Sequence, residues 1–232
     1  MTWTCFIKVL PLLLLSLAGC PYVAEEKLPA ARVATSLGEF VIELEPEKAP
    51  ATVENFTGYV AADFYDDTVF HRVVAGSLVQ GGAYDREYVL KEAGDPVENE
   101  SRNGLSNVRG AVALYYAEDP NSATSQFIIN VADHPEFDAT EEQAGFTVFG
   151  RVTEGMEVVD QIAAVPTAPR GDMEAVPVED VVIEDIELFE IPTGRLVITP
   201  AGEEYLARQP YRAAVLLRET LVELVGLLAS RD

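Results

Sequence analysis

The sequence predicts a mainly β protein, folded as a closed antiparallel barrel with two helices and followed by a C-terminal helical extension. Two observations lead to this prediction. Many short segments rich in β-branched and aromatic residues are separated by turns that contain Gly, Pro or Asn. Before residue 190, only two segments place apolar residues at helical spacing. A hydrophobic content of 48% over 232 residues is enough for one sizeable domain with a buried core.

The first predicted element is a β-hairpin over 33–44, because apolar and polar residues alternate on both sides of a turn at 36–39. The next segment, 51–62, is predicted to be an amphipathic helix, since Val53, Phe56 and Val60 recur at helical spacing. A second helix is expected over 156–165, and 99–109, rich in Asn, Gly and Ser, is expected to be a loop. Further strands are predicted over 68–74, 78–80, 110–116, 126–131, 146–152 and 181–189.

The first twenty residues have the pattern of a bacterial export signal. One cation, Lys8, precedes an apolar stretch that is shorter than the roughly 20 residues needed to span a bilayer. Residues 17–20, Leu-Ala-Gly-Cys, resemble the lipobox, where a peptidase cuts before a cysteine whose sulfur carries diacylglycerol. We therefore expect a lipoprotein signal peptide over 1–19 and a lipidated Cys20 with a tether over 20–32. The alternative is an ordinary signal peptide with a chance cysteine.

A lipidated Cys20 would make the protein a periplasm-facing lipoprotein of the bacterial cell envelope, anchored to the membrane without spanning it. Several acyl chains hold a protein far more firmly than one, since each buried CH₂ contributes about 0.8 kcal/mol. Pro21 follows Cys20 where the inner-membrane retention signal has an aspartate, which favours the outer membrane. Cys5 is the other cysteine of the chain, so no disulfide or cysteine-based metal site is expected in the folded part.

The chain is strongly acidic, with a formal net charge of −23. Such a surface repels the phosphates of DNA and RNA, so no nucleic-acid partner is expected. The charge favours solubility, or alternatively the selection of basic client proteins.

Residues 191–232 are predicted to form the helical extension. Within 203–230, leucines recur at the i, i+4, i+7 and i+11 positions of a helix: Leu217, Leu221, Leu224 and Leu228. A stripe this apolar needs a partner, which is the barrel itself, a second copy of the chain or an envelope protein.

Three short motifs follow one another in the strand regions: Phe70-His71-Arg72, Gln80-Gly81-Gly82 and Ser125-Gln126-Phe127. Together with the Asn- and Gly-rich segment 99–110 and Phe-Gly-Arg-Val at 149–152, they resemble the cyclophilins of the bacterial periplasmic branch. Cyclophilins are peptidyl-prolyl cis-trans isomerases. The resemblance implies a closed eight-stranded barrel capped by two helices over 33–190, proline-containing polypeptides as substrates, and no cofactor or metal.

The resemblance further implies that Arg72 is the key catalytic residue. Rotation about an X-Pro bond meets a barrier of about 18–20 kcal/mol, because resonance gives the C–N bond partial double-bond character. A guanidinium that hydrogen-bonds the prolyl nitrogen weakens this resonance and stabilises only the twisted state. Gln80 matches the family glutamine that binds substrate backbone and helps to hold the arginine, and Gln126 matches a second polar residue of the groove.

The apolar pocket for the proline ring departs from the family pattern. Ser77 and Ile128 stand where the family has phenylalanine, and Leu78 stands where it has methionine. Tyr115 takes the place of an alanine, and Glu136 that of an aromatic residue. Loss of an aromatic wall removes about 1–3 kcal/mol of packing, or roughly ten- to a hundredfold in rate. The substrate-binding residues expected from the resemblance are Phe70, Leu78, Tyr115, Gln126, Ile128, Phe137 and Phe146.

These residues leave three hypotheses open. The first is a membrane-anchored isomerase that assists the folding of exported proteins, supported by Arg72, Gln80 and Gln126. The second is a binding or holdase module with little turnover, supported by Ser77, Ile128 and Tyr115. The third is an envelope scaffold that acts through its C-terminal helix, 203–230.

Overall fold

The computed structural model describes residues 23–207 of the chain. These residues belong to two compact units, and the larger is Pro29–Glu190. The described part of the other unit is 23–28 and 191–207. The predicted signal peptide with Cys20, and most of the predicted helix over 203–230, lie outside the described residues.

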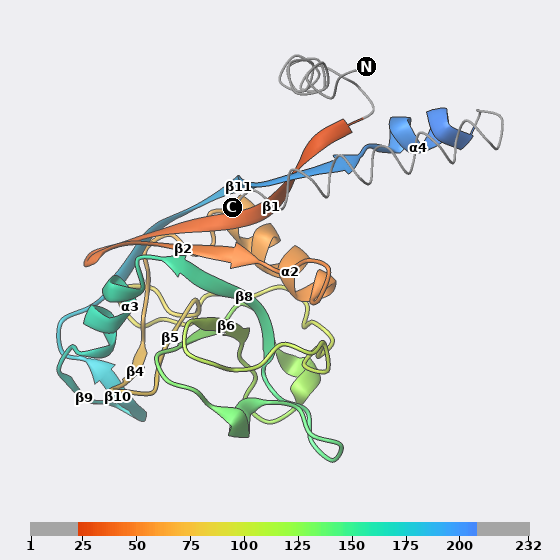
Figure 1. Cartoon of the computed structure of the whole chain (residues 1–232). Helices are drawn as coiled ribbons and strands as arrows, with labels where there is room; N and C mark the ends of the chain where they lie inside the picture. The colour runs from red at the N-terminus through yellow and green to blue at the C-terminus, as the bar shows by residue number, and fades with distance from the viewer. Residues whose placement is uncertain (1–22, 208–232) are drawn as a thin grey trace. The chain divides into compact units, whose positions relative to one another are not determined.

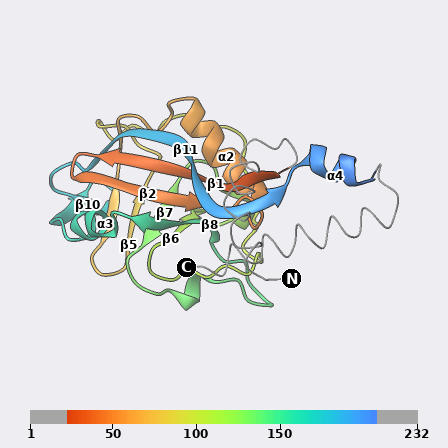
Figure 2. The ribbon, with the colours of Figure 1, turned by 45° about the horizontal axis from the view of Figure 1, so that its top comes forward.

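One curled antiparallel sheet of nine strands forms a half-barrel (Figures 1 and 2). Its strands follow one another in the order β3-β11-β1-β2-β8-β6-β7-β5-β4. Their bounds are β1 (Val23–Thr35), β2 (Gly38–Leu44), β3 (Thr68–Val69), β4 (Arg72–Val74), β5 (Leu78–Gly81), β6 (Ala111–Leu114), β7 (Phe127–Asn130), β8 (Thr147–Glu154) and β11 (Val182–Ile198). The predicted hairpin is confirmed, since Thr35 pairs with Gly38 across its turn.

The predicted mainly β, antiparallel fold is confirmed, but the sheet does not close into an eight-stranded ring. Its two ends, β3 and β4, are consecutive in sequence and are separated only by Phe70 and His71. β3 pairs with β11, whereas β4 pairs with β5. The chain thus changes partners at Phe70 and His71, and the ladder is broken there.

Both predicted helices are present, as α2 (Pro50–Ala61) and α3 (Met156–Ala163). Glu100 supplies the hydrogen bonds that the start of α2 needs, accepting from the backbone amides of Ala51 at 3.1 Å and Thr52 at 2.9 Å. Phe56 of α2 is fully buried, and its ring packs against that of Phe149 on β8, with the ring centroids 5.2 Å apart. α2 therefore covers the sheet through an aromatic contact. Among the helices of the described range, none is both long and apolar enough to cross a membrane.

Several elements differ from the prediction. Residues 23–32, expected to be a tether, belong to β1, where Ala30 and Ala31 are fully buried. β11 continues to Ile198, beyond the predicted end at 189, and α4 (Pro200–Ala207) follows it. A two-stranded sheet, β9 (Thr167–Arg170) and β10 (Met173–Pro177), was not predicted, because the exposed residues of β9 show no apolar alternation.

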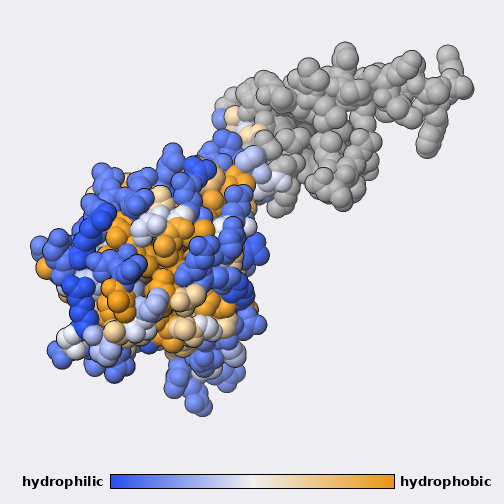
Figure 3. Space-filling view, turned by 90° about the vertical axis from the view of Figure 1, so that its left-hand side faces the viewer, coloured by the Kyte–Doolittle hydropathy of each residue, from blue (hydrophilic) through white to orange (hydrophobic). Residues whose placement is uncertain are grey.

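The core of the larger unit is aromatic at its centre. Phe56, Tyr65 and Phe127 are buried and contact one another with ring centroids 5.4–6.0 Å apart. The Tyr65 hydroxyl donates a hydrogen bond to the Ser125 carbonyl at 3.0 Å. Burial raises the pKa of Tyr65 well above its ordinary value. On the face shown in Figure 3, hydrophilic residues surround an apolar area.

Gly82, directly after β5, is expected to tolerate no side chain. Its φ is +85°, and an added Cβ would lie 2.8 Å from the Ser125 carbonyl oxygen and 2.9 Å from the Tyr65 ring. Gly82→Ala should lower the free energy of unfolding by about 3 kcal/mol or more, through overpacking and left-handed strain. Urea unfolding measures this loss.

Gly76→Ala is the matched control. Gly76 has a φ of +71°, but no atom lies within 4 Å of an added Cβ, so the cost should be only the strain of about 1–2 kcal/mol. Equal losses for the two variants would show that crowding at Gly82 contributes nothing.

Candidate active site

Arg72, Gln80 and Gln126 come together on adjoining strands. Arg72 on β4 and Gln80 on β5 are register partners, and Arg72 Nη1 donates to Gln80 Oε1 at 3.3 Å. Gln80 Nε2 in turn donates to Gln126 Oε1 at 2.9 Å. Gln80 is only 3% exposed, so its amide is held in one orientation by its two partners. The side chains of Gln126, Gln80 and Arg72 thus form a hydrogen-bonded polar chain, in which the two amides fix the position of the half-buried guanidinium.

An apolar cluster separate from the main core lies along the same strands. Its buried members are Leu78, Ala111, Ala113, Ile128 and Val148, and partly buried Tyr115, Phe137 and Phe146 pack against it. Gln80 pairs with Ile128 across β5 and β7, so their side chains emerge on the same face of the sheet. Leu78, two residues before Gln80, shares this face. The polar chain and the apolar cluster thus lie on one side of the sheet.

An aromatic group forms the partly buried wall of this cluster. The ring centroid of Phe146 lies 5.5 Å from that of Tyr115 and 5.2 Å from that of Phe137. Backbone hydrogen bonds hold the three residues in place: Tyr115 N donates to Gln126 O, and Phe146 N donates to Phe137 O, both at 2.9 Å. Aromatic surface that the sequence lacks at Ser77 and Ile128 is therefore supplied from neighbouring positions.

The structure does not bring Phe70 to this cluster. Phe70 is fully buried in the main core, where its ring meets that of Phe127 edge-on at 6.3 Å. All the other residues expected at the site from the resemblance lie in the polar chain or the apolar cluster.

Sequence reasoning missed two residues that hold the wall together. Asn107 is buried, and its Nδ2 donates to the carbonyls of Phe137 at 3.1 Å and Phe146 at 3.3 Å. His134 stacks on Phe137, with ring centroids 4.6 Å apart, and contacts Ser77. Ser77 and His134 are 57 residues apart, so no local pattern in the sequence signals this contact.

His71 lies next to the catalytic candidate and is buried. Removal from water lowers the pKa of His71 to about 4, and the positive charge of Arg72 adds to this effect. The imidazole is therefore neutral at physiological pH. Its ring packs against Tyr84 at 4.7 Å.

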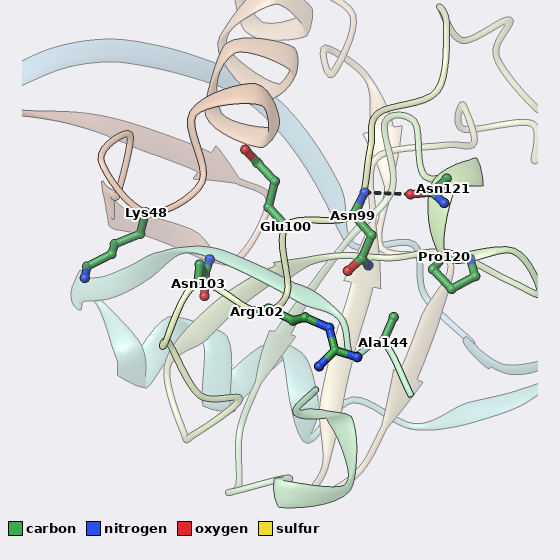
Figure 4. Close-up of a pocket in the computed structure, with 8 residues that line it drawn as sticks. All are labelled: Lys48, Asn99, Glu100, Arg102, Asn103, Pro120, Asn121 and Ala144. Atoms are coloured by element: carbon green, nitrogen blue, oxygen red, sulfur yellow. Dashed lines mark hydrogen bonds between the residues drawn. The ribbon is translucent and has the colours of Figure 1, made fainter. Parts of the chain in front are cut away.

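A hollow on the larger unit is polar (Figure 4). Its volume is about 450 Å³, and its lining residues are Lys48, Asn99, Glu100, Arg102, Asn103, Pro120, Asn121 and Ala144. Glu100 caps α2, and the backbone amide of Asn99 donates to Asn121 Oδ1 at 2.9 Å. These groups connect loops, and none of the predicted site residues lines the hollow.

The neutral, buried His71 predicts a loss of stability in acid. The unfolded chain takes up this proton near the ordinary pKa of 6.5, whereas the folded chain does so only near 4. The contribution of His71 to the free energy of unfolding is therefore lost as the pH falls from about 6.5 to about 4. This loss is about 3 kcal/mol at most. The measurement is the free energy of unfolding against pH for the wild type and His71→Asn.

The two proteins differ only at residue 71, so the difference between the two curves isolates His71. The wild-type curve should fall more steeply than that of His71→Asn between pH 6.5 and 4. Parallel curves would mean that His71 is not held neutral.

Comparison with known proteins agrees with this geometry. The family model for "Cyclophilin type peptidyl-prolyl cis-trans isomerase/CLD" matches residues 30–188. A peptidyl-prolyl cis-trans isomerase of Acinetobacter baylyi is 44% identical over 161 residues, which cover 69% of this chain and 86% of the relative. Peptidyl-prolyl cis-trans isomerase B of Escherichia coli is 42% identical over 159 residues, covering 67% of this chain and 97% of the relative.

A solved structure shows the same fold. The crystal structure of a Cryptosporidium parvum cyclophilin type peptidyl-prolyl cis-trans isomerase superimposes with a TM-score of 0.59, at 23% sequence identity. The match covers 72% of this chain and all of that one. The chain belongs to the cyclophilin-type peptidyl-prolyl cis-trans isomerase family.

Proposed function

We propose that the groove beside Arg72 isomerises X-Pro bonds in exported proteins, and that a lipidated Cys20 holds the enzyme at the bacterial envelope. Isomerase activity is supported by relatives of this name at 42–44% identity. The observation that carries the proposal is the hydrogen-bonded chain from Gln126 through Gln80 to Arg72, on the sheet face that also bears the apolar cluster.

The geometry suits rotation about a prolyl amide. The hydrogen bond to Gln80 occupies one of the five N–H donors of Arg72, which leaves others for the prolyl nitrogen. Phe137, partly buried against the cluster that contains Leu78 and Ile128, offers an apolar surface for the proline ring. The guanidinium is positioned before substrate arrives, so little reorganisation is needed as the amide twists. Each 1.36 kcal/mol gained in the twisted state alone raises the rate about tenfold.

The changed pocket is expected to alter specificity rather than abolish turnover. Tyr115 and Phe146 rebuild an aromatic wall from other positions, while the polar chain is complete. A holdase with little turnover is the outcome that remains if Arg72 proves dispensable.

Arg72→Ala should reduce kcat/KM by about a hundredfold or more, because removal of one donor to a developing charge typically costs 10²–10³. NMR exchange spectroscopy on several X-Pro peptides measures the rate. Arg102→Ala is the matched control, since Arg102 is exposed and lines the separate polar hollow. Equal activity of the wild type and Arg72→Ala would remove the catalytic assignment.

The envelope location is supported by the apolar segment before Cys20 and by the residues Leu-Ala-Gly at 17–19. Arg72, Gln80 and Gln126 all belong to the unit 29–190. Cys20 precedes this unit in the sequence. Loss of the anchor should therefore change where the protein is found and leave turnover unchanged.

Cys20→Ala should abolish incorporation of labelled fatty acid in a bacterial host, because the acceptor sulfur is lost. Cys5→Ala should still be labelled, since the peptidase would remove Cys5 with the signal peptide. Labelling of Cys20→Ala would contradict the lipoprotein assignment. The same conclusion would follow if the wild type and both variants carried no label. Fractionation of the labelled protein on a density gradient then separates inner from outer membrane.

A further inference from the structure

The imidazole of His134 joins two segments that are far apart in sequence. Its Nε2 lies 3.1 Å from the Ser77 hydroxyl and 3.2 Å from the Ser77 carbonyl oxygen. Its Nδ1 lies 2.8 Å from Glu136 Oε1. The ring stacks on Phe137 at an interplanar angle of 21°, and the side chain is only 11% exposed. His134 is thus held at both ring nitrogens and on one face.

These contacts fix the orientation of the ring. A carboxylate only accepts hydrogen bonds, so Nδ1 carries a proton toward Glu136. In the neutral imidazole, Nε2 then accepts from the Ser77 hydroxyl. In the protonated imidazole, Nε2–H donates to an oxygen of Ser77 instead. Ser77 is bound in either case, so the link does not depend on the charge of His134.

Both linked segments adjoin the apolar cluster. Ser77 ends the turn between β4 and β5 and directly precedes Leu78, a buried member of the cluster. Phe137 ends a short 3₁₀ helix (Pro135–Phe137) and packs against the same cluster. The turn and the 3₁₀ helix thus adjoin the same cluster, and the side chain of His134 connects them.

We propose that His134 is a positioning residue of the proline pocket, whose imidazole sets the separation of Phe137 from the Ser77–Leu78 edge. The imidazole also supplies a ring beside Ser77, a position that has none of its own. The inference rests on the proposed isomerase function of this groove. It predicts that His134 controls substrate binding, whereas Arg72 controls the chemical step.

The first test is a double-mutant cycle on KM for an X-Pro peptide. His134→Ala should raise KM about five- to tenfold with kcat changed less than about twofold, in line with the loss of hydrogen bonds and stacking. Ser77→Ala should raise KM about threefold. The double variant should be no worse than His134→Ala, because the link is already broken. Glu142→Gln, exposed in the nearby 141–144 segment, is the control and should match the wild type.

The second test exchanges the ring between the two positions. Ser77→Phe alone should raise KM, because a ring directed along the Ser77 side chain meets the imidazole about 3 Å away. In the His134→Ala background the same substitution should lower KM toward the wild-type value, since the space is then open. A merely structural role for His134 does not predict this reversal of sign.

Peptide binding measured by NMR titration separates the two proposals. If the wild type isomerises X-Pro peptides but folded His134→Ala keeps its KM and peptide affinity, the positioning role is overturned and the isomerase stands. If the wild type binds peptide without turnover, the proposed isomerase function is wrong. The positioning role would still be supported if the variants changed peptide affinity in the pattern predicted for KM. Additive effects of Ser77→Ala and His134→Ala, or no rescue of His134→Ala by Ser77→Phe, would also overturn it.

Discussion

The neighbouring strands β5, β6 and β7 bury both of their faces, and the alternation of side chains along them separates the main core from the apolar cluster beside Arg72. Val79, Val112 and Ile129 point into the main core. Their neighbours Leu78, Ala113 and Ile128 point to the other side and form the apolar cluster of the groove. Because side chains alternate with a period of two, a slip of one residue would exchange the two sets. The site therefore depends on the same register that builds the core.

This dependence explains which parts of the site could be predicted. Arg72 and Gln80 are eight residues apart on two strands joined by a short turn, so their meeting follows from a hairpin. Gln126 is distant in sequence, and only the family resemblance placed it beside them. Phe70 was expected at the site but lies in the core, because the ladder breaks between β3 and β4 just where Phe70 stands. Such a break cannot be read from a continuous run of strand-forming residues.

The elements that prediction missed lack the patterns on which prediction depends. β9 is fully exposed, and without a buried face it shows no alternation of apolar and polar residues. The start of β1, over 23–28, is rich in charge and resembles a tether in composition. The contact of His134 with Ser77 arises from tertiary packing alone. The buried strands β5, β6 and β7 were predicted, whereas contacts between loops were not.

The walls of the groove and the main core differ in how firmly they are held. Tyr115, Phe137 and Phe146 are only partly buried and pack on a small cluster of their own. The aromatic centre around Phe56 and Phe127 belongs to the other cluster. Partly buried side chains make fewer contacts than core residues, so we expect this aromatic wall to open at a lower free energy than the aromatic centre. Such an opening would move the wall while the buried residues beneath it, among them Ala113 and Ile128, stay packed.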